Sequence, residues 1–310
     1  MPVIIALIVL VSSLVFGSYD FGTVKASTIV KSTIASDTTW LKTNSPYSLI
    51  GQTQIEIGVK LTVEPGVIVD LNGNSLQVNG TLIAQGSVNE KIYFNNGSIV
   101  LSNGQVRSDS IIENAVLSDL SGITVDSGSP LVSNNDIKGS FNINGGSPSI
   151  TNNSIDARII VKGGSPIISN NKISDGIHAD AKGGPVTITK NEITAKSGFT
   201  AIYVQGIHAD IVGNKIIGNN SIGINGWLRI SSVLIEDNQI SNCTIGIRAD
   251  VGANANDMRI LRNLIINNSV GIVFWGITDI QNNTIAQNSI GIQCGPSPLP
   301  FKIMGEQFAK

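Results

Sequence analysis

The stretch "IISNNKIS" at residues 167–174 contains the pattern that decides the fold of this chain. Its second asparagine, Asn171, has an isoleucine three residues before it and another two residues after it. Nine asparagines share aliphatic neighbours at these two positions, at spacings of 21, 18, 18, 20, 23, 24, 25 and 20 residues. They are Asn114, Asn135, Asn153, Asn171, Asn191, Asn214, Asn238, Asn263 and Asn283. Self-similarity at a period of about 20 residues indicates a repeat protein.

Each repeat predicts short strands. Aliphatic residues alternate with glycine, asparagine and serine, as in "SIGI" at residues 221–224 and 289–292, which is typical of strands and not of helices. A unit of about 20 residues cannot bury its own apolar face, so neighbouring units must stack. Stacked coils place the asparagines above one another at about 4.8 Å, where identical amides can hydrogen-bond. The pattern therefore predicts an asparagine ladder at a turn, with an aliphatic column on either side.

These repeats, together with "LTVEPGVIVDLNGNSLQVNGTLIAQG" at residues 61–86, resemble the right-handed parallel β-helix repeat proteins of the pectin-lyase-like superfamily. The resemblance covers the chain from about Trp40 to Gln293. It implies an all-β fold, a right-handed parallel β-helix of about 11–12 coils, and an extracellular setting. Enzymes, tailspikes, adhesins and other surface proteins share this architecture, so the fold leaves the function open.

The chain divides into four segments. Residues 1–26 contain the apolar run "VIIALIVLVSSLVF" at positions 3–16, which is shorter than the roughly 20 residues of a membrane-spanning helix. They are expected to form a signal peptide or an uncleaved anchor helix. Residues 27–39 are a polar lead-in, residues 40–294 the β-helix, and residues 295–310 a C-terminal cap or truncated tail. The protein is expected to be secreted or on the cell surface, with residues 3–16 as its membrane anchor if they are retained.

Composition excludes several classes of partner and framework. The formal net charge is −2 and 14% of the residues are charged, so no basic field is available for nucleic acid or anionic lipid. The two cysteines, Cys243 and Cys294, cannot make a disulfide framework. Cys294 is expected to point inward from its strand and Cys243 to lie in a turn two coils earlier. This separation exceeds the limit of about 7 Å for a bridge, so both are expected to be free thiols.

Both histidines lie in copies of one pentapeptide, "GIHAD" at residues 176–180 and 206–210, with "GIRAD" at residues 246–250. Counted from the ladder asparagines, the middle copy falls on a different strand from the other two. A histidine and an aspartate two residues apart provide fewer ligands than the three or four of a zinc site, so no metal site is expected. Asp180 and Asp250 would stand three coils apart, about 14 Å, beyond the roughly 5–9.5 Å of a glycosidase carboxylate pair.

Aligning the coils places the outward residues in two columns on one face. The first column reads Ser140, Arg158, His178, Tyr203, Asn225, Arg248, Val273 and Gln293. The second reads Asn142, Ile160, Asp180, Gln205, Trp227, Asp250, Trp275 and Gly295. Aromatic rings beside amides and carboxylates are typical of sugar-binding surfaces, although such rings also pack under loops. The candidate ligand-binding residues are Tyr203, Gln205, Asn225, Trp227, Arg248, Asp250 and Trp275.

The motifs of the related enzymes do not appear. Polygalacturonase-like activity implies "NTD", "DD", "GHG" and "RIK", none of which is present. The sequence therefore predicts an exported β-helix surface protein, structural or glycan-binding, with a polysaccharide or surface glycan as its partner. No nucleic acid, cofactor or catalytic residue is expected. The alternative is a polysaccharide lyase or glycoside hydrolase that acts on an extracellular polysaccharide, and calcium would be relevant only to the lyase.

Overall fold

The computed structural model describes residues 26–102, 110–180, 184–228, 231–252, 257–276, 278–296 and 302–309. The predicted signal peptide or anchor at residues 1–26 lies outside the described residues except for its last position. Among the residues described, no helix has the length and hydropathy needed to cross a membrane. One short 3-10 helix, η1 (Lys42–Asn44), interrupts a succession of strands.

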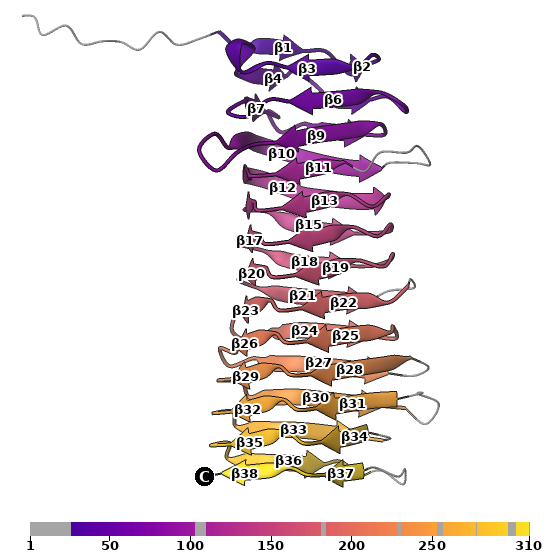
Figure 1. Ribbon diagram of the computed structural model, residues 1–310, viewed down its shortest axis with the longest axis vertical. Helices are drawn as coiled ribbons and strands as arrows, with labels where there is room; N and C mark the ends of the chain where they lie inside the picture. The colour runs from indigo at the N-terminus through magenta and orange to yellow at the C-terminus, as the bar shows by residue number, and fades with distance from the viewer. Residues whose placement is uncertain are drawn as a thin grey trace, which may run out of the picture.

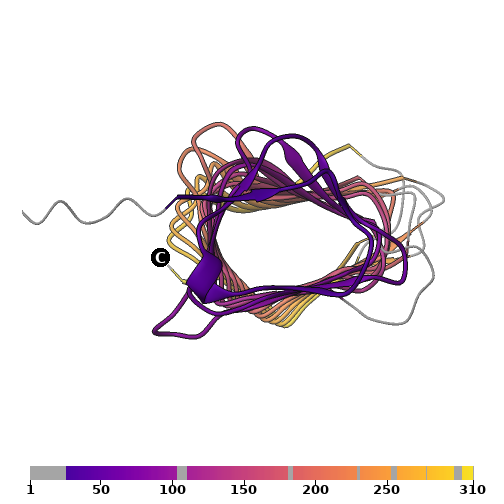
Figure 2. The ribbon, with the colours of Figure 1, turned by 90° about the horizontal axis from the view of Figure 1, so that it is seen from above.

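The strands stack into a solenoid of parallel coils, from β1 at one end to β38 at the other (Figure 1). Viewed along its axis the chain winds repeatedly around one closed outline (Figure 2). Each coil contributes strands to three faces, which we call faces 1, 2 and 3. Strands of successive coils pair in parallel within each face, and Ile150 for example lies opposite Ile168 of the next coil.

Face 1 is, within the described residues, a separate sheet of 13 strands with one strand per coil. Its members are β3 (Thr38–Trp40), β6 (Lys60–Val63), β9 (Thr81–Gln85), β11 (Ile111–Glu113), β13 (Leu131–Ser133), β16 (Ser149–Thr151), β19 (Ile167–Ser169), β22 (Val186–Thr189), β25 (Ala209–Val212), β28 (Ser232–Glu236), β31 (Asp257–Leu261), β34 (Thr278–Gln281) and β37 (Lys302–Met304).

Faces 2 and 3 are joined by the long strands β10 (Ile92–Ser102) and β12 (Ala115–Ser127), which contribute to both. Face 2 also contains β1 (Thr28–Val30), β4 (Tyr47–Leu49), β7 (Ile68–Asp70), β14 (Asp136–Ile137), β17 (Ser154–Ile155), β20 (Lys172–Ile173), β23 (Glu192–Thr194), β26 (Lys215–Ile217), β29 (Gln239–Ser241), β32 (Leu264–Ile266), β35 (Thr284–Ala286) and β38 (Gln307–Ala309). Face 3 also contains β2 (Thr33–Ile34), β5 (Thr53–Ile55), β8 (Ser75–Val78), β15 (Ser140–Ile143), β18 (Arg158–Val161), β21 (Gly176–Asp180), β24 (Thr200–Gln205), β27 (Ile222–Leu228), β30 (Ile245–Val251), β33 (Val270–Trp275) and β36 (Ile290–Cys294).

The solenoid extends past the 40–294 range expected from the sequence at both ends. Strands β1 and β3 pair with β4 and β6, so the lead-in is already coiled. At the other end β37 and β38 pair with β34 and β35. The described part of the C-terminal segment therefore adds strands to the stack.

The corner between faces 1 and 2 is a turn with one left-handed residue followed by the ladder asparagine. The left-handed residues are Asn134, Asn152, Asn170, Lys190, Gly213, Asp237, Arg262 and Asn282, with φ between 55° and 68°. Asparagine and glycine tolerate this conformation better than most residues, which explains why so many of these positions carry them. From β13 onward the same two-residue turn joins the strands of these two faces, which keeps the coils in register.

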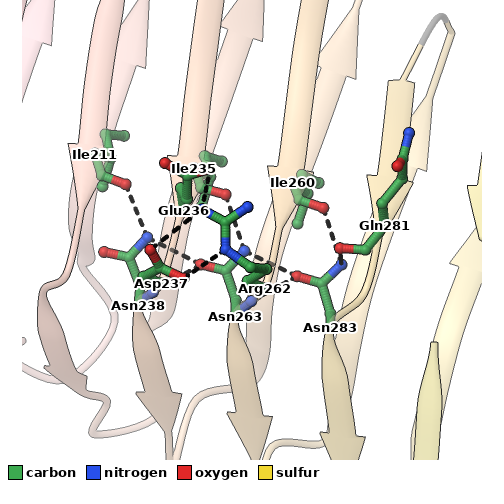
Figure 3. A network of polar contacts seen from close by, with 10 residues as sticks. All are labelled: Ile211, Ile235, Glu236, Asp237, Asn238, Ile260, Arg262, Asn263, Gln281 and Asn283. Carbon is green, nitrogen blue, oxygen red and sulfur yellow. Dashed lines mark hydrogen bonds and ion pairs between the residues drawn. The ribbon is translucent and has the colours of Figure 1, made fainter. Parts of the chain in front are cut away.

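The ladder satisfies every polar group of its asparagine side chains. The Asn171 Nδ2 donates to Asn191 Oδ1 at 3.0 Å and to the carbonyl of Ile150 at 2.9 Å, and the backbone N–H of Asn171 also reaches Asn191 Oδ1, at 2.9 Å. The last rungs, Asn238, Asn263 and Asn283, repeat this arrangement (Figure 3). These asparagines are at most 2% exposed, so water does not reach their amides. The ladder hydrogen bonds therefore take the place of hydrogen bonds to water.

Eight of the nine predicted asparagines form the ladder, and Asn114 does not. Ile112 pairs with Val132, so Ala115 stands at the ladder position and its backbone N–H donates to Asn135 Oδ1 at 2.8 Å. Asn114 is instead the left-handed residue of its turn, with φ of 48°. The assignment was wrong because Ile111 and Val116 match the aliphatic pattern one residue before the pair that actually points inward, Ile112 and Leu117.

Aliphatic columns fill the interior on all three faces. On face 1 the column is Ile168, Ile188, Ile211, Ile235, Ile260 and Ile280, and each of these side chains is fully buried. Burying one such side chain contributes about 1.5–3 kcal/mol. At the corner between faces 2 and 3, glycine is required for close approach of the coils, since a Cβ at Gly246 would lie 2.6 Å from the carbonyl oxygen of Gly271.

Both cysteines are free thiols, as expected. Cys243 is buried, and burial raises the pKa of its thiol to about 12. Cys294 pairs with the inward-pointing Phe274 but is exposed, because β36 is the last strand of face 3 among the described residues. Cys294 therefore occupies an inward position in the strand pairing, as expected, but its side chain is not buried.

Replacement of a ladder asparagine tests the fold. In Asn214→Ala, the Nδ2 and backbone N–H of Asn191 lose their acceptor and the Ile188 carbonyl loses its donor. We expect the free energy of unfolding to fall by about 1–3 kcal/mol, since a buried unsatisfied group carries that cost. Chemical denaturation would measure it. The exposed Asn219→Ala is the matched control, and equal losses in both variants would contradict the ladder's role.

Glu306 occupies the ladder position of the last described coil, where its carboxylate accepts from the Asn283 backbone at 3.1 Å. Burial is the main cause that raises its pKa above the ordinary value. A raised folded pKa adds stability below the unfolded pKa that is lost as pH rises through the folded pKa. Unfolding curves between about pH 4 and pH 7 should therefore show Glu306→Gln gaining stability relative to wild type as pH rises. A constant difference across this range would contradict the prediction.

Thiol labelling of the native protein tests the last coils. A thiolate reagent should modify Cys294, because it is exposed, and leave Cys243 unmodified until the chain is denatured, because its pKa is raised to about 12 by burial. Mass spectrometry would identify the labelled residue. The Cys294→Ser variant should remain unlabelled in its native state, and labelling of Cys243 in that variant would show that its coil is not closed as described.

Candidate functional site

The seven candidate ligand-binding residues lie together on the outer side of face 3. Strand pairing places Tyr203, Asn225 and Arg248 opposite one another on β24, β27 and β30. The neighbouring column continues Gln205, Trp227, Asp250 and Trp275 from β24 to β33. Three strand steps separate Asp180 from Asp250, as the alignment predicted.

The alignment was wrong one coil earlier, at Arg158. This residue pairs with Gly176, and His178 pairs with Ile160. Arg158 and Gly176 each lie five residues after a ladder asparagine, Asn153 and Asn171 respectively, and the strands keep this offset because both coils have turns of equal length. Arg158 therefore lies two residues before the position that pairs with His178, and it does not join the column to which it was assigned.

A cleft of about 240 Å³ opens beside Tyr203 on this face. It is lined by Arg158, His178, Gly198, Phe199, Thr200, Tyr203 and Asn225. Only Tyr203 and Asn225 belong to the predicted set. The other residues come from the two preceding coils, from the turn before β24 and from the first position of β24, which sequence alignment alone did not bring together.

His178 and Tyr203 line the cleft as a ring pair. Their centroids are 4.6 Å apart with planes inclined by 35°, and the Tyr203 hydroxyl donates to Gln205 Oε1 at 2.5 Å. Burial lowers the pKa of His178, against the opposing effect of Asp180, and burial also raises the pKa of Tyr203. Both rings are consequently uncharged near neutral pH.

Arg158 and Phe199 also line the cleft, with the guanidinium of Arg158 above the ring of Phe199. The Cζ of Arg158 lies 4.7 Å from the Phe199 centroid, and its Nη2 lies 2.8 Å from Asp175 Oδ1. Lys196 lies 3.5 Å from the same carboxylate. Phe199 remains 50% exposed, so it presents a ring to solvent that the ion pair holds in place.

Phe199 owes its position to a lengthened turn. The ladder spacing increases from 20 residues before Asn191 to 23 residues after it, and the turn between β23 and β24 contains "KSGF" at residues 196–199. The longer spacing was the signal in the sequence that this coil carries an insertion. It could not show that the inserted ring would reach Arg158, two coils away.

The two tryptophans differ in their accessibility. Trp227 is 39% exposed, whereas Trp275 is half-buried, with the guanidinium of Arg248 5.0 Å from its ring. A Cβ at Gly295 would overlap the Trp275 indole, so the ring lies across that glycine. Val273, expected to face solvent, is only 4% exposed beside these side chains. Trp275 therefore packs on the protein, and Trp227 is the more accessible tryptophan.

Charged groups along the face are balanced in pairs. Arg248 Nη2 lies 3.6 Å from Asp250 Oδ2 on the same strand, and Arg158 is paired with Asp175. Within the described residues, no group of three or more histidine, cysteine or acidic side chains could hold a metal ion. This face therefore offers aromatic, amide and hydroxyl groups, and both of its arginines, Arg158 and Arg248, are paired with carboxylates.

The repeated pentapeptide is a strand sequence that occurs on two faces. The first copy is β21 on face 3, and "GIRAD" lies in β30 on the same face. The middle copy leads into β25 on face 1, where His208 Nδ1 lies 2.8 Å from Ser232 Oγ. The prediction that the middle copy lies on a different strand is confirmed, and only His178 takes part in the cleft.

Comparison with known proteins supports the architecture. Residues 157–297 match the family described as right handed beta helix region. No curated protein and no solved structure matches the chain significantly. The match covers the coils that carry the cleft, and parallel coils continue on both sides of it. The chain thus folds as a right-handed parallel β-helix, an architecture consistent with the pectin-lyase-like resemblance of its repeats.

Proposed function

We propose that this is an exported β-helix protein that binds a glycan on the outer side of face 3. The observation that carries the proposal is the cleft of about 240 Å³ beside Tyr203, with the half-exposed ring of Phe199 at its edge. The row of Asn225 and Trp227 on the next strand extends this surface along the axis. The apolar run at residues 3–16 supports export.

The chemistry of the cleft suits a sugar ring. Phe199 and Trp227 provide exposed aromatic surface against which the apolar side of a pyranose can pack. The Asn225 amide and the Thr200 hydroxyl line the cleft and can both donate to and accept from sugar hydroxyls. A small number of placed polar groups among apolar ones is the usual composition of a ligand site.

The charge distribution favours an uncharged glycan. Arg158 is already paired with Asp175 at 2.8 Å, and Lys196 shares that carboxylate. Asp180, two residues after His178, adds a further negative charge to the same strand. An anionic sugar would therefore have to displace an existing ion pair, whereas an uncharged one would not.

Cleavage of the bound polysaccharide is a second candidate function, favoured by the His178–Tyr203 pair. The lowered pKa of His178 leaves an imidazole that can accept a proton near neutral pH, beside a phenol whose ring lies 4.6 Å away. The appearance of new reducing ends or unsaturated products on incubation with a polysaccharide panel would establish this function. Binding without either product supports the first candidate.

Ring truncation tests the proposed binding face. Phe199→Ala and Trp227→Ala should each weaken glycan binding by about 1–3 kcal/mol, by analogy with base–aromatic stacking. This corresponds to about 5-fold to 150-fold in affinity. Isothermal calorimetry on ligands selected from a glycan array would measure this. Trp275→Ala should lower the free energy of unfolding, because the Trp275 ring packs across Gly295.

The matched control is His208→Ala. This change removes a ring from a perfect copy of the pentapeptide, but on face 1, so glycan affinity should not change. Each variant would first be checked for an unchanged melting temperature. Full affinity in both ring variants, or loss in the His208 variant alone, would show that the ligand binds elsewhere.

A further inference from the structure

A second hollow lies at the corner between faces 2 and 3, where the last three turns stack. It is about 410 Å³ in volume, larger than the cleft beside Tyr203. Six of its lining residues form amide–hydroxyl pairs, one pair per coil: Asn242 with Thr244, Asn267 with Ser269, and Gln287 with Ser289. Asn220, Cys243 and Asn268 complete the lining. We call this hollow the corner groove.

Two members of a short second ladder, Cys243 and Asn268, line the corner groove. The backbone N–H of Cys243 donates to Asn268 Oδ1 at 2.9 Å, and Asn268 Nδ2 donates to Asn288 Oδ1 at 3.0 Å. The preceding residue in each turn is left-handed, with φ of 59° at Asn242, 58° at Asn267 and 55° at Gln287. This conformation turns the ladder side chain inward and leaves the preceding amide outside.

The rim of the corner groove carries amide and hydroxyl side chains, most of which form no hydrogen bond in the described residues. All six rim side chains are exposed. Thr244 donates its hydroxyl proton to the Ser221 carbonyl at 2.9 Å. In the part of the chain that the structure describes, no side-chain hydrogen bond is formed by the other five: Asn242, Asn267, Gln287, Ser269 and Ser289. Two parallel rows of donors and acceptors therefore face solvent, repeating along the axis at about 4.8 Å.

The lining restricts the chemistry of a ligand. No charged and no aromatic side chain lines the groove, so an ionic ligand would lose hydration without gaining a counter-charge, and an apolar ligand would find little surface to cover. An extended peptide binds best by pairing with an unoccupied strand edge, whereas these coils already pair with one another. A chain with repeated hydroxyl groups and no charge fits both rows.

The corner groove continues the same edge of the solenoid that carries Phe199. The turn containing Phe199 lies directly beside the next turn, since the N–H of Gly198 donates to the carbonyl of Asn220 at 3.2 Å. Asn220 in turn lines the groove. A linear ligand that packs on Phe199 can therefore extend along the axis into the groove without changing face.

We infer that the corner groove is a second binding site, for an extended, uncharged polysaccharide chain that runs along the axis from Phe199 past Gln287. The inference takes its class of ligand from the proposed function but depends on a separate set of residues. It makes binding dependent on chain length, because only a long chain reaches both the cleft and the groove.

The test removes the amides and keeps the turns. In the triple variant Asn242→Gly, Asn267→Gly and Gln287→Gly, glycine retains the left-handed conformation and deletes three side chains. Binding would be measured for soluble uncharged polysaccharides (β-glucan, mannan and xylan), with polygalacturonate as the anionic comparison. For the uncharged polysaccharide that the wild type binds, affinity should fall about tenfold or more in this variant. The matched control is Asn282→Gly, the same change at an exposed left-handed residue with φ of 57° in the other corner, which should bind as wild type.

Short oligosaccharides separate the two sites. They should lose affinity in Phe199→Ala but not in the triple glycine variant. The double variant Ser269→Ala and Ser289→Ala, which leaves the backbone unchanged, provides an independent deletion if the triple variant unfolds, and it should also weaken binding of long chains.

Two results would overturn the inference: wild-type affinity for long uncharged chains in both groove variants, or loss of polygalacturonate binding alone. If Phe199→Ala loses affinity while the groove variants do not, the inference fails and the proposed function stands. If the groove variants lose affinity while Phe199→Ala and Trp227→Ala do not, the groove is confirmed and the proposed face is wrong. Absence of binding to every uncharged polysaccharide would reject both.

Discussion

The two-residue turn that buries a ladder asparagine is the constraint on which the rest of this structure depends. A corner inside a stack of coils leaves backbone N–H and carbonyl groups without water, and each would be costly if unpaired. The asparagine Oδ1 accepts two N–H groups from the coil before, and its Nδ2 donates to two oxygens, as Asn191 and Asn214 illustrate. The side chain thus supplies the hydrogen bonds that the turn removes from the backbone.

Fixing one corner frees the other corners to vary. Because the register is reset at each ladder asparagine, the turns between faces 2 and 3 can lengthen without shifting the aliphatic columns, since a shift of one residue would expose the whole inward set. The insertion before β24 brings Phe199 to the surface in this way, while Ile193 and Ile202 on either side remain fully buried. The candidate binding surfaces are built where the fold tolerates variation, as is usual for loops on a rigid scaffold.

The outer side of face 3 and the corner groove contrast in chemistry, although the turns that line the groove lead directly into strands of face 3. Face 3 has rings held by cations, Phe199 by Arg158 and Trp275 by Arg248. The corner groove has neither rings nor charges and presents amides and hydroxyls. The difference arises because strand residues two apart share a face and can stack along it, whereas left-handed turn positions favour asparagine and other small polar residues.

The sequence by itself determined the repeat, the parallel β-helix, eight ladder asparagines and the alignment of the candidate columns from His178 onward. These follow from local rules, because a buried asparagine and its aliphatic neighbours recur at positions that each coil must present to the next. Asn114 shows the limit of such rules, since the two adjacent aliphatic residues Ile111 and Ile112 allow the alignment to slip by one residue. Arg158 was misaligned although its offset from Asn153 equals that of Gly176 from Asn171, the residue with which it pairs.

Only the tertiary structure decided which outward side chains meet. Arg158 and Phe199 are 41 residues apart in the sequence. Their contact depends on how far the lengthened turn before β24 extends across two coils. Trp227 and Trp275 occupy equivalent positions in the repeat, yet one is exposed and the other packs across Gly295. Outward side chains are not fixed by the stacking of the coils, so their contacts arise from neighbours on other coils that no local pattern encodes.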